Sequence, residues 1–281
     1  MGDNIKIVIS DLDGTLLPAQ GEVSNRDMDT LKKLKEEKIV RVIATGRNLY
    51  SALSVLTDDF PIDYLIFASG AGIFDWKKRE LIFSQHLDAD SVFALSSELI
   101  RLKTDFMILD TIPNNHQFAY YRSGNSNPDF DRRLSLYKPF ANPIGDVGET
   151  KREACQLLVI LSNCVNGFNE LKAKFENVKI IRATSPLDHE SIWMEIFPLH
   201  ISKAYGAEWL CMHLKIDSKC SIVIGNDYND LDLLEWGKHP YVVGNAPKEL
   251  RDSYQVSKSV DESGFSYAID QVLNKVRNTK A

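Results

Sequence analysis

The chain reads IKIVISDLDGTLL over residues 5–17. Residues 5–10 form a short β-branched run that Asp, Gly and Thr follow directly, which predicts a buried strand ending in a loop. Asp11 and Asp13 would lie just past the end of this strand. Two carboxylates at this spacing can face one Mg²⁺, and Gly14 permits the tight turn that follows them.

Asp11 could also act as a nucleophile. A carboxylate that attacks phosphorus forms an aspartyl-phosphate, which is a covalent intermediate used by enzymes. Asp13 could protonate the leaving oxygen and afterwards activate the water that hydrolyses the acyl phosphate. The alternative interpretation is an Asp-rich turn without chemistry.

The segments after this stretch alternate between helical and strand patterns. Ser24 is a candidate N-cap with Asp27 three residues later, and apolar residues follow at helical spacing. Residues 39–44 and 64–68 are predicted strands, with a helix near residues 48–56 between them. Because strands that alternate with helices pair in parallel through right-handed crossovers, this part of the chain predicts a doubly wound, Rossmann-like α/β sheet.

The pattern changes after Phe74. The next stretch predicts a mixed α+β insert, of about 110 residues, without α/β alternation. Its expected elements are a hairpin at 75–87, helices at 91–102 and 166–175, and strands at 106–112, 118–123, 155–161 and 178–185. Residues 123–143, rich in Asn, Pro and Gly, are expected to break the regular structure.

The α/β pattern returns from about Ile192. Strands are expected at 221–225 and 240–245, a helix at 230–236, and a further helix with the apolar stripe Ile201, Tyr205, Trp209 and Met212. We therefore expect an α/β core made of residues 1–80 and 190–281, and a smaller α+β cap domain made of residues 81–189.

Composition narrows the classes of partner. The chain has 281 residues and a formal net charge of -6, whereas a nucleic-acid surface needs a basic excess. We see no apolar run long enough to cross a bilayer, and the first residues lack the pattern of a secretory signal. We expect a cytoplasmic protein with no nucleic-acid or membrane partner. Its protein partners cannot be inferred from these features.

Three further polar clusters fall near the ends of predicted core elements, where open parallel sheets gather ligands. They are Thr45-Gly46-Arg47, Lys203, and the run from Gly225 to Asp230. Taken singly, each cluster has an ordinary interpretation. The first could be a strand-to-helix turn, the second a solvated surface lysine, and the third a capped helix start.

Residues 11–17, DLDGTLL, resemble the first motif of the haloacid dehalogenase superfamily. An Asp at position 13 is the phosphatase form of that motif. Dehalogenases of the superfamily lack this second Asp, and its ion-pumping ATPases carry Lys-Thr-Gly-Thr after the nucleophile. The resemblance therefore implies phosphate-ester hydrolysis, and it assigns Thr15 to the substrate pocket.

Thr45-Gly46-Arg47 resembles the second motif of the superfamily. The Thr45 hydroxyl can donate to a phosphoryl oxygen, the amides from Gly46 onward can approach the phosphate, and Arg47 is expected to bind substrate. Lys203 stands where the family places a lysine that neutralises the nucleophile and the phosphate. Ala204 follows it in place of the usual Gly.

The run GNDYND, residues 225–230, resembles the GDxxND metal motif. Asn226 stands where the family has a metal-binding Asp, which removes a negative charge and should weaken metal binding unless Asp227 compensates. Asn229 and Asp230 keep their places and are expected to orient metal waters, Lys203 or the nucleophile, with Asn229 also near the substrate. The implied metal set is Asp11, Asp13, Asn226, Asp227 and Asp230.

Weaker similarities extend the resemblance over nearly the whole chain. Ser69-Gly70-Ala71 is similar to an Asn-Gly-Ala turn, Asn245-Ala246 to an Asn-Ala pair near the phosphate pocket, and residues 261–264 to an acidic Gly loop. The insert falls between the second and third motifs, which is typical of the Cof-like subfamily of cap-bearing sugar phosphatases.

The resemblance implies a Mg²⁺-dependent phosphatase that hydrolyses small phosphorylated metabolites, with sugar phosphates as the expected class, through phospho-Asp11. The cap should select the leaving group. Its candidate contacts, which could equally be packing residues, are His116, Tyr120, Arg122 and His189. Two alternatives stay open. One is a phosphomutase of the same superfamily, and the other is a metabolite-binding protein in which Asn226 has weakened catalysis.

Overall fold

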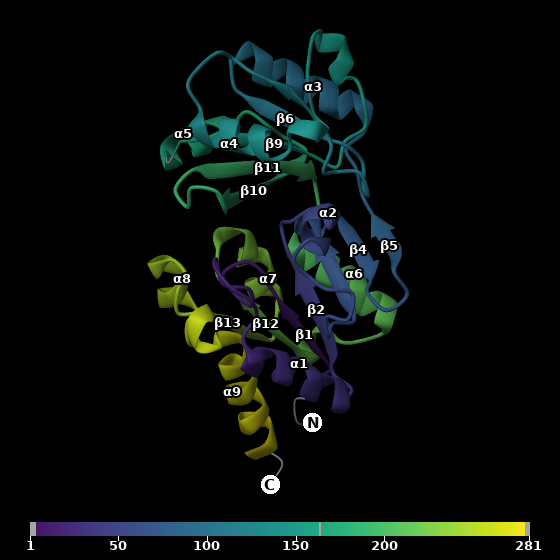
Figure 1. The fold of residues 1–281 in the computed structure, drawn as a ribbon, viewed down its shortest axis with the longest axis vertical. Coiled ribbons are helices and arrows are strands. Elements are labelled where there is room, and N and C mark those ends of the chain that lie inside the picture. Colours follow the sequence, from purple (N-terminus) through teal and green to yellow (C-terminus); the bar gives the residue numbers. More distant parts are fainter. Residues whose placement is uncertain (1–3, 163, 279–281) are drawn as a thin grey trace. The chain divides into compact units, whose positions relative to one another are not determined.

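The computed structural model describes residues 4–162 and 164–278, which form two compact units (Figure 1). The core unit contains the described residues up to 47, residues 56–83 and the described residues from 202 onward. The insert unit contains residues 48–55 and the described part of 84–201. Whether these units correspond to a catalytic core and a substrate-selecting cap stays a prediction.

The core unit is built on an eight-stranded sheet with the order β14-β13-β12-β1-β2-β3-β4-β5. Its strands are β1 (Ile7–Ser10), β2 (Val40–Ala44), β3 (Tyr64–Phe67), β4 (Gly72–Asp75), β5 (Glu80–Ser84), β12 (Ser221–Gly225), β13 (His239–Val242) and β14 (Gln255–Val256). Strands β14 to β3 in that order pair in parallel, and β4 is antiparallel to β3. The doubly wound parallel sheet predicted from the sequence is confirmed.

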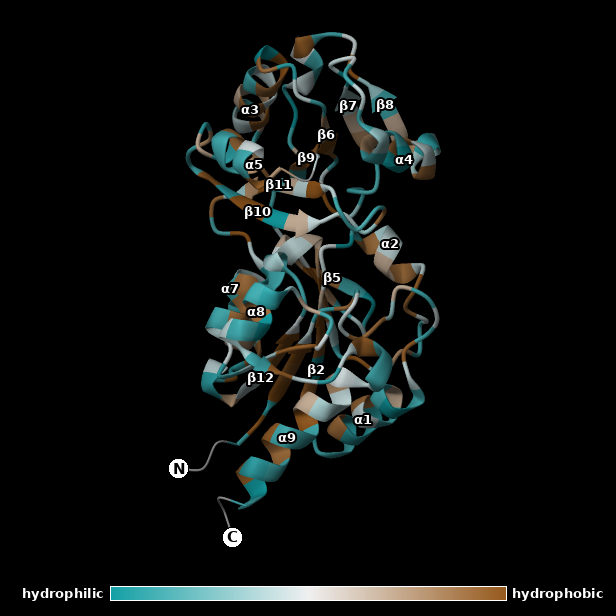
Figure 2. Ribbon diagram, turned by 90° about the vertical axis from the view of Figure 1, so that its left-hand side faces the viewer, coloured by the Kyte–Doolittle hydropathy of each residue, from teal (hydrophilic) through white to brown (hydrophobic). Residues whose placement is uncertain are grey.

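Strand β1 lies between β12 and β2, and all four of its residues are buried. A strand covered on both faces is apolar on both, which explains the unbroken β-branched run that the sequence shows there. Ile7 and Ile9 face the same hydrophobic cluster, because alternate residues of a strand point to the same side. In Figure 2 the strands near the labels β2 and β12 are largely in the brown of hydrophobic residues.

Helices cover the core sheet. They are α1 (Asn25–Glu36), α6 (Lys203–Leu214), α7 (Leu231–Trp236), α8 (Lys248–Ser253) and α9 (Gly264–Asn278). Helices α1 and α9 lie together, and the buried Asp27 carboxylate joins them by accepting from the Ser266 amide and hydroxyl. As predicted, Ser24 caps α1, and its hydroxyl accepts from the Asp27 amide. In the described part of the chain, no helix combines the length and apolar character that a membrane span requires.

The apolar stripe predicted for α6 is wrong in part. Met212 is 67% exposed, and the buried face of the helix carries small or slender residues, among them Gly206, Ala207 and Leu210. The reason is a close approach of the helix to the sheet, since a Cβ at Gly206 would lie 2.8 Å from Ile66. Larger side chains therefore lie on the flank of the helix. The spacing of these residues in the sequence had instead predicted that they lie in the core.

The insert unit has a six-stranded sheet with the order β10-β11-β9-β6-β7-β8. Its strands are β6 (Phe106–Leu109), β7 (Phe118–Tyr121), β8 (Ala141–Pro143), β9 (Gln156–Leu161), β10 (Val178–Thr184) and β11 (Ile192–Pro198). All its pairings are antiparallel except that of β7 with β8. Because β11 belongs to this sheet, the α/β pattern returns with α6 and not at Ile192.

Each face of the insert sheet has its own hydrophobic cluster. Residues of α3 (Ala89–Arg101) and α5 (Val165–Lys172) pack on one face, and Phe130 of α4 (Pro128–Leu136) packs on the other. Helix α4 corrects the expectation of irregular structure over residues 123–143. Its start is favoured because the Asn127 side chain caps it and Pro128 occupies its first turn, which suits a residue without an amide hydrogen. The short helix α2 (Leu49–Leu53) also belongs to this unit.

The four candidate substrate contacts of the cap all lie in the insert unit. Arg122 donates to Asp105 at 2.5 Å, and its guanidinium stacks over Phe130. His116 stacks on Tyr50, with ring centroids 4.8 Å apart. The remaining two are Tyr120, which packs edge-on to Phe130, and His189, whose backbone has φ 59°. The contacts of Arg122, His116 and Tyr120 fit packing roles, and substrate contact by any of the four residues stays a prediction.

Candidate active site

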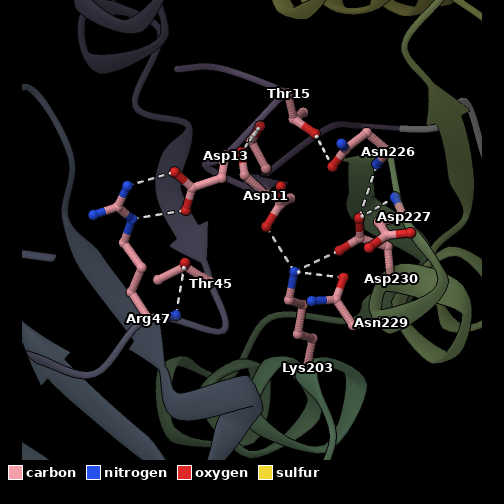
Figure 3. A network of polar contacts seen from close by, with 11 residues as sticks. Asp11, Asp13, Thr15, Thr45, Arg47, Lys203, Asn226, Asp227, Asn229 and Asp230 are labelled. Carbon is pink, nitrogen blue, oxygen red and sulfur yellow. Dashed lines mark hydrogen bonds and ion pairs between the residues drawn. The ribbon is translucent and has the colours of Figure 1, made fainter. Parts of the chain in front are cut away.

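The structure brings the four polar clusters of the sequence together at one edge of the core sheet (Figure 3). Asp11 directly follows β1, Thr45 follows β2, and Asn226 follows β12, while Lys203 is the first residue of α6. This edge is formed by the carboxyl ends of parallel strands, the place where open α/β sheets bind ligands.

The turn after β1 fixes the two aspartates. The Asp11 amide continues the sheet by donating to the Ile224 carbonyl at 2.9 Å. This hydrogen bond holds the backbone from which the buried Asp11 side chain extends. The Leu12 carbonyl then accepts from three later amides, which closes the turn. Gly14 has φ +76°, and a Cβ there would lie 2.6 Å from the Asn226 side chain. Glycine is therefore required both by the backbone and by the space.

Lys203 is the charge centre of the site. Its fully buried ammonium donates to Asp11 Oδ1 and Asp230 Oδ1, each at 2.6 Å, and reaches Asn229 Oδ1 at 3.4 Å (Figure 3). Burial alone would lower the pKa of Lys203, but the carboxylates of Asp11 and Asp230 raise it above its ordinary value. The ammonium therefore stays charged.

Asp11 lies in an environment that opposes its negative charge. Burial raises the pKa of its carboxyl to about 7, with Lys203 acting in the opposite direction and the neighbouring Asp230 and Asp13 adding to the rise. A poorly solvated carboxylate whose charge is offset by one ammonium is suited to attack on phosphorus.

Asp13 is held by Arg47. The guanidinium donates from Nε to Asp13 Oδ2 and from Nη2 to Asp13 Oδ1, each at 2.7 Å. Thr45 lies beside this pair, and its hydroxyl accepts from the Arg47 amide at 3.1 Å. The sequence assigned Arg47 to substrate binding and did not indicate this ion pair, because residues 34 positions apart give no sign of it.

The carboxylate of Asp230 organises the loop after β12. Its Oδ1 accepts from Lys203, and its Oδ2 accepts from the amides of Asn226 at 2.8 Å and Asp227 at 3.1 Å. Asp227 caps the short helix η5 (Tyr228–Asp230) in a reciprocal capping box with Asp230. Both oxygens of Asp230 are thus used by the protein, and direct metal ligation by Asp227 or Asp230 stays a prediction.

The donor set near Asp11 fits a divalent cation. One terminal atom of the Asn226 amide lies 3.1 Å from both Asp11 Oδ2 and the Asp13 carbonyl oxygen. Adjacent ligands of an octahedral Mg²⁺ with bonds of about 2.1 Å are separated by about 3.0 Å, so this spacing matches. In residues 4–162 and 164–278, no cluster of three or more His, Cys, Asp or Glu side chains could hold a metal. The atoms gathered around Asn226 are thus one carboxylate, from Asp11, and the Asp13 backbone carbonyl, whereas the Asp13 carboxylate is held by Arg47 and its ligation of a metal stays a prediction.

The other predicted substrate residues lie around this centre. The amide of Asn245 is used by the protein, because it donates to the Gly14 carbonyl at 2.8 Å and accepts from the Val260 amide at 2.9 Å. It therefore fixes the turn that carries the two aspartates. A Cβ on Gly46 would lie 3.6 Å from the Asn229 side chain, so Gly46 and Asn229 are neighbours. Thr15 donates to the Asn226 amide oxygen at 3.0 Å in the orientation drawn in Figure 3.

Gly70 and Ser202 are two positioning residues whose roles the sequence reasoning missed. Gly70 has φ +105°, and a Cβ there would lie 2.0 Å from the Ser202 carbonyl oxygen. The Ser202 hydroxyl accepts from the Tyr205 amide and so caps α6 immediately before Lys203. The contact sets where α6 begins, and therefore where Lys203 lies. The sequence feature that could have indicated this close contact is Gly70 itself, a glycine that follows the strand predicted at residues 64–68.

Comparison with known proteins shows what the whole chain is similar to. A family model described as haloacid dehalogenase-like hydrolase matches residues 8–269. The chain is 27% identical to the 5-amino-6-(5-phospho-D-ribitylamino)uracil phosphatase YwtE of Bacillus subtilis, over 96% of this chain and 99% of that protein. It is 23% identical to the phosphatase YwpJ of the same bacterium, over 96% and 100% of the two chains.

Solved structures show the same fold. A phosphatase of the haloalkanoate enzyme superfamily from Bacteroides thetaiotaomicron superposes with a TM-score of 0.76, at 23% identity, over 96% of this chain and 95% of that one. A subclass IIB sugar phosphatase of the superfamily superposes with a TM-score of 0.75, at 18% identity, over 95% and 98%. At this identity the likeness concerns the fold alone.

Proposed function

The chain belongs to the haloacid dehalogenase-like hydrolases, and on that premise we propose that it is a Mg²⁺-dependent phosphatase of small phosphorylated metabolites. The proposed reaction proceeds through a phosphorylated Asp11. Relatives named as phosphatases align with it over almost the full length of both chains, which supports phosphate-ester hydrolysis as the reaction type.

One observation supports the proposal above all others. Asp11 presents a buried carboxylate at the end of β1, with Lys203 Nζ at 2.6 Å from one of its oxygens and a second aspartate two residues further on. A nucleophile, a fixed positive charge and an acid-base group thus lie in one site. Stability does not explain such an arrangement well, because burying charged groups away from water is costly.

In the first step, an oxygen of Asp11 attacks the phosphorus of the substrate, and the bond from phosphorus to the leaving oxygen breaks. The product is an acyl phosphate on Asp11 and an alcohol, whose oxygen takes its proton from Asp13. Lys203 and the Thr45 hydroxyl are the groups available to bind the phosphoryl oxygens.

In the second step, Asp13 takes a proton from water as the water oxygen attacks the phosphorus of the acyl phosphate. The bond between phosphorus and Asp11 breaks, and inorganic phosphate and free Asp11 result. Because Arg47 contacts both oxygens of Asp13 in this structure, one of the two contacts has to open before Asp13 can exchange protons with substrate or water. We infer that the other contact keeps Asp13 oriented during the reaction.

Asp11 Oδ2, the Asp13 carbonyl and the Asn226 amide oxygen are the groups that would hold Mg²⁺. A bound Mg²⁺ supplies charge compensation for the phosphoryl group. Asp230 contributes indirectly, since it fixes both Lys203 and the backbone amide of Asn226.

We propose sugar phosphates as the substrate class. One structural relative is named as a sugar phosphatase, and one curated relative is named for a substrate with a phospho-D-ribityl group. We further propose that the insert, predicted as residues 81–189, selects the leaving group. Substitutions there should change the ranking of substrates by kcat/KM, and an unchanged ranking would contradict this role.

The covalent step can be tested by quenching the enzyme in acid during turnover of a hexose phosphate and analysing its peptides by mass. The peptide with Asp11 should gain one phosphoryl group, and hydroxylamine should remove it. Product analysis in the same reaction separates the two enzyme alternatives. Free phosphate supports the phosphatase, an isomeric hexose phosphate would indicate a phosphomutase, and tight binding without either product would indicate a binding protein.

A further inference from the structure

The side chain of Asn226 lies where Asp11, Asp13 and Thr15 converge. The amide atom on that side is 3.1 Å from Asp11 Oδ2, 3.1 Å from the Asp13 carbonyl oxygen and 3.0 Å from Thr15 Oγ1. The oxygen and nitrogen of an amide have nearly the same size, so its orientation follows from the hydrogen bonds that each end can make.

With the amide oxygen turned toward this cluster, only the Thr15 hydroxyl can donate to it (Figure 3). The other two neighbours are a carboxylate oxygen and a carbonyl oxygen, which have no hydrogen to donate. Three oxygen atoms at this spacing repel one another unless a cation lies among them. With the nitrogen turned inward, its two hydrogens can serve Asp11 Oδ2 and the Asp13 carbonyl.

We propose that Asn226 is an amide switch in the metal site. Its nitrogen faces inward and takes the place of the cation when the site is metal-free, and its oxygen turns inward when a cation binds. The inference rests on the metal site of the proposed function and goes beyond it, because it assigns a role to the amide before any metal arrives.

The surroundings of Asn226 allow this switch and little other movement. A Cβ on Gly14 would lie 2.6 Å from the other terminal atom of the amide, so the side chain is closely packed on that side. The backbone amide of Asn226 is fixed to Asp230 at 2.8 Å. Exchange of the two amide ends by rotation about the last side-chain bond keeps the shape of the side chain, whereas other rotations would not.

An aspartate at position 226 could not act in this way. A carboxylate has no hydrogen to donate, and it would place a further negative charge beside Asp11 and the Asp13 carbonyl. An aspartate site is therefore strained without a cation and strongly attractive toward one. Asparagine has the opposite effect on both properties. It keeps the metal-free site ordered, and it weakens cation binding because the cation must displace the hydrogen bonds of the amide.

The experiment compares the wild type with Asn226→Asp, using MgCl₂ as the only ligand. In chelator, Asn226→Asp should unfold at a temperature lower by about 3 °C or more. Its calorimetric Kd for Mg²⁺ should be smaller by about 10-fold or more, and saturating Mg²⁺ should raise its Tm further than that of the wild type. Asn125→Asp, which adds the same charge at an exposed loop residue, is the matched control and should change none of these three quantities.

A second readout reports the orientation itself. In the wild type, nuclear magnetic resonance should find the Asn226 side-chain amide protons slow to exchange with water in chelator and exchanging faster once Mg²⁺ is bound. The switch is overturned if these protons exchange in chelator like those of a free amide. It is also overturned if Asn226→Asp matches the wild type in chelator, or if it binds Mg²⁺ no more tightly. Because no substrate is present, these results are independent of whether the chain hydrolyses phosphate esters.

Discussion

Arg47 binds both oxygens of Asp13, with two donor-acceptor distances of 2.7 Å, and so holds the proposed acid-base group by a two-point contact. A fork of this kind fixes the orientation of a carboxylate, which a lysine ammonium cannot do. The ion pair is only partly exposed, with 26% of the Arg47 side chain and 40% of the Asp13 side chain accessible.

We expect Arg47→Lys to lower kcat by about 10- to 100-fold while KM changes little, because general acid-base catalysis depends on the placement of the acid. Steady-state kinetics on a hexose phosphate measure both constants. Arg26→Lys, in an exposed pair with Asp270, is the control and should leave kcat unchanged. A raised KM at unchanged kcat would instead support the direct substrate contact predicted from the sequence.

Gly70→Ala should destabilise the core unit and reduce activity. The added Cβ would lie 2.0 Å from the Ser202 carbonyl oxygen, so the start of α6, and Lys203 with it, has to move. We expect a loss of about 2 kcal/mol or more in the free energy of unfolding, since backbone atoms cannot yield as a flexible side chain can.

Gly21→Ala is the matched control for this substitution. Gly21 has φ +107°, close to the +105° of Gly70, but a Cβ there meets nothing within 4 Å. Both variants share the conformational strain of about 1 kcal/mol, and only Gly70→Ala adds the clash. Denaturant unfolding of the two should therefore differ, and equal losses would mean that the contact with Ser202 is unimportant.

Lys203→Met should abolish turnover and also destabilise the fold. It leaves the buried carboxylates of Asp11 and Asp230 without their shared ammonium, and removing one member of a buried ion pair costs about 3–5 kcal/mol. The exposed Lys32→Met, which breaks an ion pair with Asp29, should cost less than about 0.5 kcal/mol.

The double variant Lys203→Met with Asp230→Asn tests the cause of this loss. If unpaired charge is responsible, the second change should restore part of the stability without restoring turnover. A double variant as unstable as the single one would point to lost packing instead.

Asp63 should make the stability of the core unit depend on pH. It is partly buried, and hydrogen bonds from Arg41 and Lys77 overcome the effect of burial and lower its pKa below the ordinary 3.8. A lowered pKa in the folded state contributes stability above pH 3.8, and that contribution is lost as the pH falls through the folded-state pKa.

Unfolding measured at a series of pH values between about 6 and 2 should therefore give a steeper loss of stability for the wild type than for Asp63→Asn. Asp58→Asn, in an exposed pair with Arg79, is the control and should keep the wild-type slope. Parallel curves for Asp63→Asn and the wild type would show that the Asp63 pairing adds no pH-dependent stability.

Local patterns predicted much of this molecule. The apolar run of β1, the Ser24 cap and the alternation of strands and helices each depend on neighbours in sequence, and the structure contains them. The gathering of Asp11, Thr45 and Asn226 also followed from the sequence, because each comes after a parallel strand and such strands share one edge.

The remaining features depend on contacts between distant residues. The buried face of α6 is set by its close approach to Ile66, which spacing along the helix does not indicate. The pairing of Arg47 with Asp13 and the orientation of the Asn226 amide likewise depend on atoms brought together by folding. Helix α4 was missed because its cap at Asn127 and its Pro128 are also typical of irregular segments.

The central claim is that Asp11 carries the phosphoryl group in a metal-dependent hydrolysis. The most direct measurement is phosphate release from a panel of phosphorylated sugars and cofactors, with Mg²⁺ and with chelator, by the wild type and by Asp11→Asn. The account predicts release by the wild type that needs Mg²⁺ and that falls by about 1000-fold or more in Asp11→Asn. Release by Asp11→Asn at the wild-type rate, or no release by the wild type from any substrate, would contradict it.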